Sequence, residues 1–255
     1  MRLSQLFFRY GRRAPWVLTD VCLTLASGDV VEVSGANGAG KSTLLRLLAG
    51  LTPPTRGAIE GRPAVVGFAP DHFPVGQPFT VADYLRHMAR IRGGARYEPW
   101  AERLGLSPML GHRLRDLSKG SAHKVGLVQA LMAAPGLLIL DEPFAGLDAV
   151  TRDTLPEIVT EIAARGGIVI ASDHQNGLSA LPSVRHWSVA DGHLTERATP
   201  TPSPTVPAPL SSPAAASQAA PSTAVVEVTL PADEAPALIA RLRDQGYDVR
   251  ERTLA

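Results

Sequence analysis

The chain has 255 residues, with 25 lysines and arginines against 24 aspartates and glutamates. Hydrophobic residues make up 45% of it and charged residues 19%, which is typical of a globular protein and excludes a wholly disordered or collagen-like chain. The formal net charge of +1 argues against broad electrostatic binding to nucleic acid or anionic lipid, so we expect no nucleic-acid partner.

Cysteine content and hydropathy narrow the class further. The single cysteine, Cys22, excludes a disulfide framework and a zinc site of the CxxC type. A transmembrane helix needs ~20 apolar residues, and the best run, Leu131–Leu140, is shorter and contains Pro135 and Gly136. The N-terminal segment has too short an apolar core for a secretory signal. We therefore expect a cytoplasmic protein.

Short apolar runs indicate the fold class. Longer stretches with helical periodicity separate these runs, and near-continuous apolar runs are typical of strands buried on both faces of a parallel sheet. The predicted strands are Val30–Ser34, Val65–Ala69, Leu137–Leu140 and Ile168–Ser172. The sequence thus predicts an α/β fold.

A glycine-rich loop follows the first of these strands. Residues 35–43 read GANGAGKST and fit the phosphate-loop pattern GxxxxGK[ST], and a predicted helix, Lys41–Ala49, comes directly after it. Glycines let successive backbone N–H groups turn toward phosphate oxygens, and the helix N-terminus reinforces them. Lys41 is placed to reach the β- and γ-phosphates, and the Ser42 hydroxyl to ligate Mg²⁺.

Three further segments carry polar side chains at the ends of predicted elements. Leu117–Ser121 opens a predicted helix, Ser121–Ala134, and is either an anion site or an ordinary N-cap. The strand Leu137–Leu140 ends in Asp141 and Glu142, which can face a Mg²⁺ ion and an attacking water. His174 follows the strand Ile168–Ser172, where ligands sit in such sheets.

Together these motifs resemble the nucleotide-binding subunit of an ATP-binding cassette (ABC) transporter over about residues 1–197. Gly35–Thr43 resembles the Walker A motif, and Leu137–Glu142 the Walker B motif with its catalytic glutamate. LSKGS at Leu117–Ser121 is similar to the family signature, Ala145–Asp148 to the D-loop and His174 to the switch histidine. Tyr10 matches the aromatic residue that stacks on adenine, with Phe8 as a weaker candidate.

The resemblance implies a P-loop NTPase cassette: a mainly parallel sheet with helices on both faces, N-terminal antiparallel strands and a small helical subdomain. It implies Glu142 and His174 as catalytic residues, Ser42 and Asp141 as Mg²⁺ ligands, and Ser118 and Gly120 as contacts to the partner subunit's ATP. Asp148 would be the D-loop aspartate. The implied ATP-binding residues are Tyr10, Gly35, Ala36, Asn37, Gly38, Ala39, Gly40, Lys41, Ser42 and Thr43.

The sequence departs from the family pattern at two motifs. Asp71 stands where the family usually has glutamine, so an amide donor is replaced by a shorter, charged side chain that could reach Mg²⁺ through water. Lys119 and Ser121 alter the signature, although Ser118 and Gly120 are retained. Coupling of hydrolysis to a membrane partner is the function that the Asp71 change puts in doubt.

The resemblance also implies partners and a mechanism. Two such subunits, identical or different, dimerise head to tail around two ATP molecules and hydrolyse them. They dock on a separate transmembrane subunit through the helical stretch Val81–Leu117, on the cytoplasmic face of the membrane. The short helical insert, the segment Asp141–Phe144 and the GGIVI…DHQ stretch are similar to export-type subunits, so we expect export.

Other classes compete with this interpretation. A soluble ABC-type ATPase of a non-transport process is one, but the interval from Thr43 to Leu137 is too short for the coiled coil of chromosome-organising ATPases. The chain also lacks the second cassette of the translation factors and the zinc cysteines of the repair enzymes. A regulator that never hydrolyses ATP is another, and Glu142 and His174 argue against it.

The C-terminal part differs in composition. Residues Thr199–Thr223 contain seven of the 22 prolines and no charge, which predicts a disordered linker after a cassette domain of residues 1–198. Residues 224–255 predict a small βαβ appendage with strands Val225–Leu230 and Tyr247–Thr253. So short a unit usually needs a partner to fold, so it either pairs with its copy in another subunit or packs on its own cassette.

Overall fold

The computed structural model describes residues 1–173, 177–178, 181 and 183–197. His174, the predicted linker and the predicted appendage lie outside these residues. Within the described part of the chain, none of the helices combines the length and the apolar composition needed to cross a bilayer.

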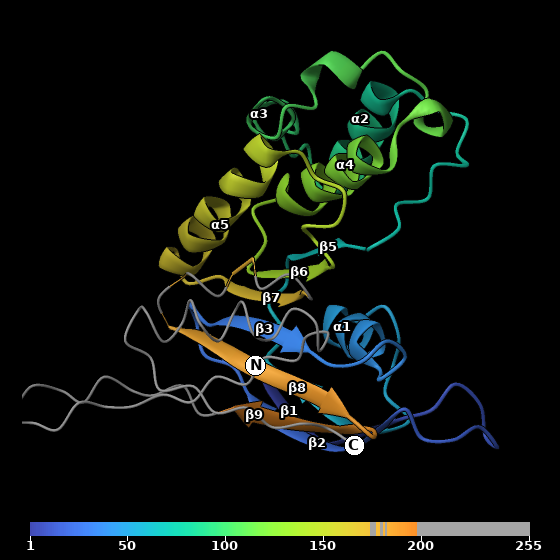
Figure 1. Cartoon of the computed structure of the whole chain (residues 1–255), viewed down its shortest axis with the longest axis vertical. Coiled ribbons are helices and arrows are strands. Elements are labelled where there is room, and N and C mark those ends of the chain that lie inside the picture. Colours follow the sequence, from blue (N-terminus) through green and yellow to red (C-terminus); the bar gives the residue numbers. More distant parts are fainter. Residues whose placement is uncertain (174–176, 179–180, 182, 198–255) are drawn as a thin grey trace, which may run out of the picture. The chain divides into compact units, whose positions relative to one another are not determined.

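A six-stranded sheet forms the centre of the cassette (Figure 1). Its first five strands in spatial order are parallel, and the last strand pairs antiparallel with its neighbour. In spatial order the strands are β5 (Val66–Ala69), β6 (Leu137–Asp141), β7 (Ile168–Ser172), β3 (Val30–Ser34), β8 (Val184–Ala190) and β9 (His193–Arg197). The predicted α/β class is confirmed, and the predicted strand at Val65–Ala69 is one residue shorter than expected.

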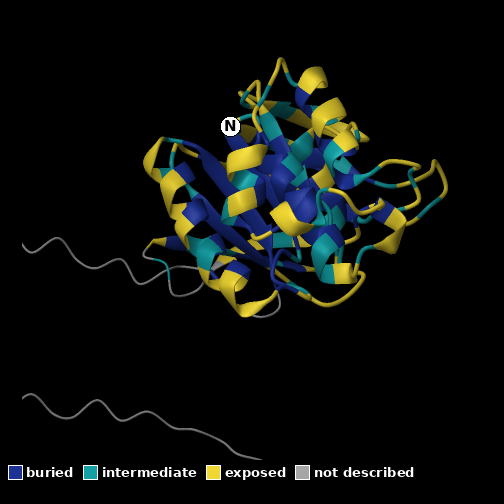
Figure 2. Ribbon diagram, turned by 90° about the horizontal axis from the view of Figure 1, so that it is seen from above, coloured by how far each residue is buried: buried dark blue, intermediate teal, exposed yellow. Residues whose placement is uncertain are grey.

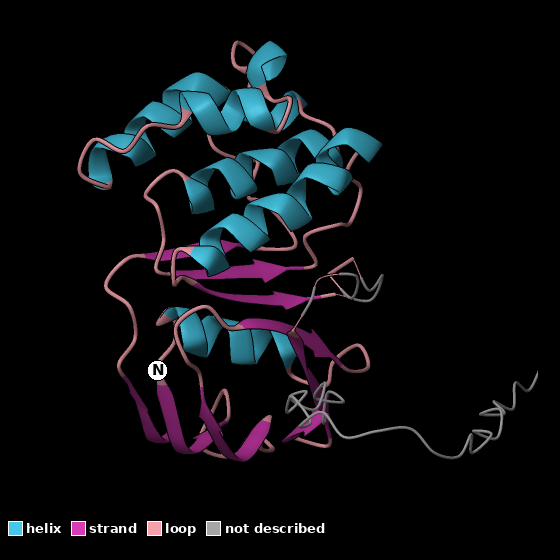
Figure 3. Ribbon diagram, turned by 90° about the vertical axis from the view of Figure 1, so that its left-hand side faces the viewer, coloured by secondary structure: helices cyan, strands magenta, loops and turns pink. Residues whose placement is uncertain are grey.

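A second, three-stranded antiparallel sheet is built from the N-terminal strands. Its order is β2 (Leu18–Thr24), β1 (Arg2–Phe8) and β4 (Arg56–Glu60). Helix α1 (Lys41–Ala49) lies between this sheet and the large sheet, as Figure 3 shows. Its four leucines, Leu44, Leu45, Leu47 and Leu48, are all 0% exposed because the helix is covered from both sides.

The other helices cover the opposite face of the large sheet (Figures 1 and 3). They are α2 (Val81–Ile91), α3 (Glu98–Arg103), α4 (Lys119–Leu131) and α5 (Ala149–Ala164), with the short 3₁₀ helices η1 (Ser107–Met109) and η2 (Leu114–Asp116). Two apolar cores result, one on each face. In β6, Leu137 and Ile139 join the core around α1, whereas Leu138 and Leu140 join the core under α4 and α5. The central strands β3, β6 and β7 are accordingly buried almost throughout, and the dark blue of buried residues fills the middle of Figure 2.

Two predicted helices have different bounds. The helix expected at Ser121–Ala134 is α4, which begins two residues earlier because Ser118 caps it and ends earlier because Ala134 has a φ of 47°. The helical stretch expected at Val81–Leu117 is not continuous. Gly93 and Gly94, with φ values of 71° and 82°, end the run after α2, and only α3, η1 and η2 follow before α4.

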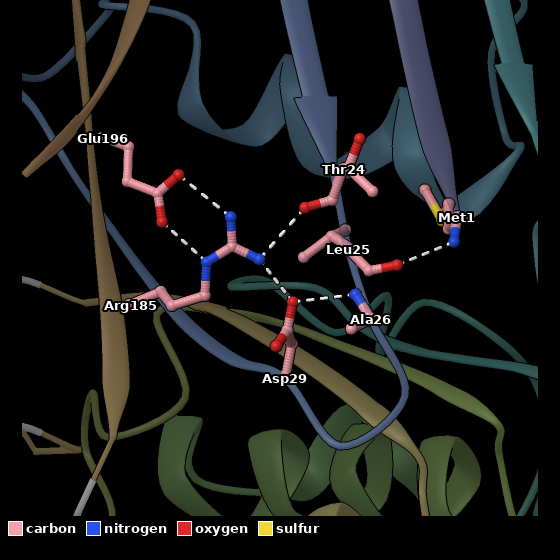
Figure 4. A network of polar contacts seen from close by, with 7 residues as sticks. All are labelled: Met1, Thr24, Leu25, Ala26, Asp29, Arg185 and Glu196. Carbon is pink, nitrogen blue, oxygen red and sulfur yellow. Dashed lines mark hydrogen bonds and ion pairs between the residues drawn. The ribbon is translucent and has the colours of Figure 1, made fainter. Parts of the chain in front are cut away.

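An ion-pair network joins the small sheet to the edge of the large one (Figure 4). The Arg185 guanidinium on β8 donates to both carboxylate oxygens of Glu196 on β9, at 2.6 and 2.9 Å. It also donates to the Thr24 carbonyl, at 3.0 Å, and to the carboxylate of Asp29 in the turn before β3. Asp29 in turn accepts from the Ala26 N–H at 2.9 Å, so one guanidinium holds three segments together.

Replacing Arg185 with methionine should lower the free energy of unfolding by about 2 kcal/mol, because it leaves the carboxylates of Asp29, which is 19% exposed, and Glu196, which is 39% exposed, without their cation. Arg86→Met is the matched control: each side chain of its ion pair with Asp83 is 52% exposed, so its loss should lower the free energy of unfolding far less. Denaturant unfolding of both variants measures the difference, and equal losses would contradict this role of Arg185.

The same network predicts a pH dependence. The Arg185 guanidinium lowers the pKa of Glu196, so this stabilisation is present above the ordinary carboxylate range and is lost as pH falls through the lowered pKa. The difference in free energy of unfolding between wild type and Arg185→Met should therefore become smaller as the pH falls. A difference that stays constant down to pH 3 would show that Glu196 contributes nothing to it.

Candidate nucleotide site

The glycine-rich loop joins the end of β3 to the start of α1. Its backbone has positive φ at Gly35 (146°), Gly38 (81°) and Gly40 (108°). A Cβ at Gly35 would lie 2.4 Å from the carbonyl oxygen of Val189, so the chain has room only for glycine there. Helix α1 begins at Lys41, and the unpaired N–H groups of its first turn adjoin the loop. This is the geometry of a phosphate-binding loop.

Lys41 and Tyr10 flank this loop. The Lys41 ammonium donates to the carbonyls of Gly35, at 2.7 Å, and Ala36, at 3.2 Å, and so lies across the loop. The Tyr10 ring is 66% exposed, and its hydroxyl lies 2.8 Å from the Thr43 hydroxyl. Phe8 is buried and packs edge-on against Tyr10, with ring centroids 5.0 Å apart, so it supports Tyr10 and has no exposed face of its own.

Asp141, at the end of β6, connects the end of β7 to the start of α1. Its Oδ1 accepts from the hydroxyls of Ser42, at 3.2 Å, and Ser172, at 2.7 Å. The parallel register explains the convergence, since Ser172 pairs with Asp141 on one side and with Val33 on the other. Asp141 is only 3% exposed, so its charge is held in place by these hydroxyls.

Glu142 follows in a strained backbone conformation. Its φ is 53°, and its N–H donates both to the Ser172 carbonyl, at 3.1 Å, and to the Ser172 hydroxyl, at 3.0 Å. Positive φ is uncommon for residues other than glycine and is found at functional sites. Ser172 thus fixes Asp141 through its side chain and Glu142 through both its carbonyl and its hydroxyl.

These groups surround one cavity of about 580 Å³. It is lined by Tyr10, Val17, Asn37, Gly38, Gly40, Lys41, Ser42, Thr43, Asp71, Glu142 and Ala145. The structure therefore brings the loop, Tyr10, Asp71 and Glu142 to one place. Its size and its donors suit a nucleotide with phosphates.

The residues at this cavity also suit a hard cation. Ser42 and Asp141 present oxygen atoms beside the phosphate loop, and Mg²⁺ prefers oxygen ligands and keeps several waters. Over the described residues, no group of three or more His, Cys, Asp or Glu side chains is arranged as a metal site. A cation here would thus depend on phosphate and water for its other ligands.

Asp71 lines the cavity in the loop that follows β5. Its carboxylate lies 2.6 Å from Nδ1 of the neighbouring His72, which is largely exposed. The contact of Asp71 with a cation through water stays a prediction.

The signature segment faces elsewhere. Ser118 caps α4 by accepting from the Ser121 N–H at 3.1 Å, and neither Ser118 nor Gly120 is among the residues that line the cavity. Gly120 packs against the loop that follows β6: a Cβ at this position would lie 2.3 Å from the Gly146 carbonyl oxygen. The N-cap predicted for this segment is present.

Asp148 caps the next helix. Its carboxylate accepts from the Thr151 N–H, at 2.9 Å, at the start of α5, and pairs with the Lys124 ammonium of α4 at 2.5 Å. The hydrogen bonds from Lys124 and Thr151 lower the pKa of Asp148 to about 2. The side chain is therefore ionised throughout the physiological range, and like the signature it lies outside the cavity lining.

His174 itself lies outside the described residues, but the residues around it are informative. Asp173 is buried, and its Oδ2 accepts from the Gly177 N–H at 2.5 Å. Gly177 packs on Phe144, since a Cβ there would lie 2.5 Å from that ring. Gly177 is thereby held both by Asp173 and against the loop that follows Glu142.

Sequence reasoning missed three residues of this site. Ser172 stands at the end of a predicted strand, and the rule that functional groups gather at the carboxyl ends of parallel strands could have found it. Val17 lines the cavity, and His123 donates to the Ala145 carbonyl from α4, but no motif spacing pointed to either. Ala145, which also lines the cavity, was predicted only as the first residue of the D-loop motif.

Comparison with known proteins gives a consistent family. Residues 18–145 match the family model described as ABC transporter. The zinc import ATP-binding protein ZnuC of Alkalilimnicola ehrlichii is 35% identical over 191 residues, covering 72% of this chain and 72% of the relative. ZnuC of Cereibacter sphaeroides is 36% identical over 157 residues, covering 60% of this chain and 64% of the relative.

Solved structures agree. A structure titled as the ATP binding subunit of an ABC transporter superposes with a TM-score of 0.68 and 29% identity, covering 77% of this chain and 88% of that one. A dimeric post-hydrolysis ATP-binding cassette bound to ADP and Pi has a TM-score of 0.64 at 21% identity, covering 77% of this chain and 97% of that one, which shows the shared fold alone.

Ser172→Ala should lower kcat for ATP hydrolysis about tenfold, because Asp141 and the Glu142 N–H both lose a hydroxyl partner. ATP affinity measured without Mg²⁺ should stay within about twofold, since the phosphate loop is untouched. Ser27→Ala removes a hydroxyl bond to the Gly166 carbonyl far from the cavity and is the control. Equal activities of the two variants would contradict the bridging role of Ser172.

Proposed function

The chain belongs to the ABC transporter family as an ATP-binding, ATP-hydrolysing subunit, and from this premise we propose that it powers transport through a separate membrane subunit. One observation carries the proposal: a single cavity gathers the phosphate loop, including Ser42, and Glu142, and the buried Asp141 is hydrogen-bonded to the Ser42 hydroxyl at its edge. The same arrangement supports the proposed role of each residue.

ATP would bind with its phosphates along Gly35–Thr43. The Lys41 ammonium, now on the loop carbonyls, would turn to the β- and γ-phosphates, and the exposed Tyr10 ring would stack on adenine. Ser42 and Asp141 would hold Mg²⁺, which supplies charge neutralisation of the phosphate oxygens when bound. The remaining loop residues, Ala36, Asn37, Gly38, Ala39, Gly40 and Thr43, would contribute backbone and side-chain donors.

Hydrolysis would depend on positioning and electrostatics. Glu142 lines the cavity at the end of β6, where its carboxylate would orient and polarise the attacking water. His174 would contact the γ-phosphate. Asp71 would reach the cation through water.

A second subunit would complete the site. Ser118 and Gly120 begin α4 away from the cavity of their own chain, so they are available to the nucleotide of a partner in a head-to-tail dimer. Asp148 would lie at the same dimer interface. A homodimer and a heterodimer both fit this arrangement.

The membrane partner would contact the helical region between Asp71 and the signature. We propose a peripheral location on the cytoplasmic face, with residues 81–117 as the docking region. We also retain the division into a cassette of residues 1–198, a linker of residues 199–223 and an appendage of residues 224–255.

The predicted direction of transport, export, needs revision. Export was expected from the sequence, but the relatives whose printed names state a direction are zinc import proteins. They give export no support and favour import. Zinc is accordingly the first cargo to test, on the strength of those names.

Glu142→Gln should bind ATP with near-wild-type affinity but lose at least about a hundredfold in kcat, because an amide cannot accept a proton from the attacking water. Glu60→Gln, at the exposed end of β4, is the matched control and should hydrolyse normally. Phosphate release measures both, and wild-type turnover in Glu142→Gln would remove Glu142 from the mechanism.

Lys41→Ala should weaken ATP binding about tenfold or more, since a charge-assisted contact to the phosphates is lost. Lys119→Ala changes a lysine outside the cavity lining and should leave ATP affinity of the isolated chain unchanged. Titration with a fluorescent ATP analogue distinguishes them. Unchanged binding in Lys41→Ala would overturn the phosphate-loop assignment.

Deleting the gene should lower cellular uptake of radioactive zinc if the protein powers zinc import, and the wild-type gene should restore it where Glu142→Gln does not. Zinc accumulation above the wild-type level would instead support export. Unaltered zinc flux would exclude zinc as the cargo.

A further inference from the structure

Helix α4 is fastened to the loop that follows Glu142 at several points. Gly120 lies against the Gly146 carbonyl with no room for a side chain, and Lys124 pairs with Asp148. Between them, Nδ1 of His123 lies 3.2 Å from the Ala145 carbonyl oxygen. The signature helix thus holds the segment that runs from the catalytic glutamate to the D-loop within the same chain.

His123 is an unusual member of this set. Its side chain is 1% exposed, and burial lowers its pKa below the ordinary histidine range, so the ring is neutral at neutral pH. A carbonyl oxygen only accepts, so Nδ1 carries the proton and donates it. Nε2 then carries a lone pair, and among the described residues it has no hydrogen-bond partner. Within the described part of the chain, the hydrogen bond to Ala145 is therefore the one that this buried ring makes.

A tight turn links the His123–Ala145 hydrogen bond to Glu142. The Ala145 N–H donates to the Glu142 carbonyl at 3.2 Å, so Ala145 is held by Glu142 on one side and by His123 on the other. Glu142 has the strained φ of 53°, a conformation that persists only where surrounding contacts impose it. Ala145 also lines the nucleotide cavity. Loss of the His123 bond would free the turn beside the reacting phosphate.

We propose that His123 is a positioning residue for ATP hydrolysis: its Nδ1–H fixes the Ala145 carbonyl and thereby holds the turn that sets the conformation of Glu142. The inference rests on the proposed catalytic role of Glu142. His123 does not line the cavity, so it acts on the reaction only through this turn.

His123 also lies near the loop after β5, in which Asp71 replaces the family's usual glutamine. The charges that act on the ring are Asp71, which favours its protonation, and Lys119 and His72, which oppose it. Gly126, on the next turn of α4, packs on Phe73 and Pro70 of that loop. His123 therefore stands where α4, the Asp71 loop and the catalytic turn meet.

The test compares two replacements of His123 in the full chain. Asparagine places an amide N–H on Cγ, where histidine has Nδ1, and so retains the donor. Leucine fills the buried space without a donor. His123→Leu should lower kcat for ATP hydrolysis ten- to hundredfold with KM for ATP within about twofold, whereas His123→Asn should stay within about threefold of wild type.

A stability control separates positioning from folding. Val159→Ala removes buried apolar volume from α5, away from the cavity, and should lower the melting temperature without changing kcat. Folding of each variant is checked by its melting temperature and its ATP affinity. Wild-type kcat in a folded His123→Leu, or a loss in His123→Asn equal to that in His123→Leu, overturns the proposal.

The Glu142→Gln variant, measured in the same assay, separates this proposal from the function on which it rests. Full turnover in Glu142→Gln overturns the role of Glu142 and the inference with it. An inactive Glu142→Gln beside a fully active His123→Leu overturns the inference alone.

Discussion

The cassette depends on one buried carboxylate at the point where three strands end. Asp141 accepts hydroxyl hydrogen bonds from Ser42, at the start of α1, and from Ser172, at the end of β7. A carboxylate that is 3% exposed is costly to bury unless it is hydrogen-bonded, so these contacts hold the ends of β6 and β7 against the start of α1. The phosphate loop, the proposed cation ligands and Glu142 come together because of that arrangement.

The second constraint is the turn from Glu142 to Asp148. It starts with a strained residue, crosses the buried Phe144 and ends as the cap of α5. Helix α4 holds it through Gly120, His123 and Lys124. Movement of α4 would therefore shift the turn that carries the proposed catalytic glutamate, which would link the proposed contact with a partner subunit to the chemistry.

Much of this could be predicted from the sequence, and the reasons for the exceptions are physical. The residues within the phosphate loop have a fixed spacing, and both this loop and Asp141–Glu142 follow apolar strands. Their positions at the carboxyl ends of neighbouring strands were therefore predictable. The contacts of Ser172, Ala145 and His123 arise from sheet register and helix packing between segments distant in the chain, which no local pattern encodes. The helical stretch after Val81 was predicted as one unit and is broken at Gly93–Gly94, because conformation there depends on glycine backbones rather than on apolar periodicity.

The central claim is that Gly35–Thr43, Asp141 and Glu142 form one ATP site completed by a second subunit. A crystal structure of full-length Glu142→Gln with ATP and Mg²⁺ tests it most directly. The account predicts phosphates along the loop amides, Mg²⁺ at the Ser42 hydroxyl beside Asp141, and Ser118 of a second copy at the γ-phosphate. Nucleotide bound elsewhere, or a cation held without Ser42 and Asp141, would contradict it.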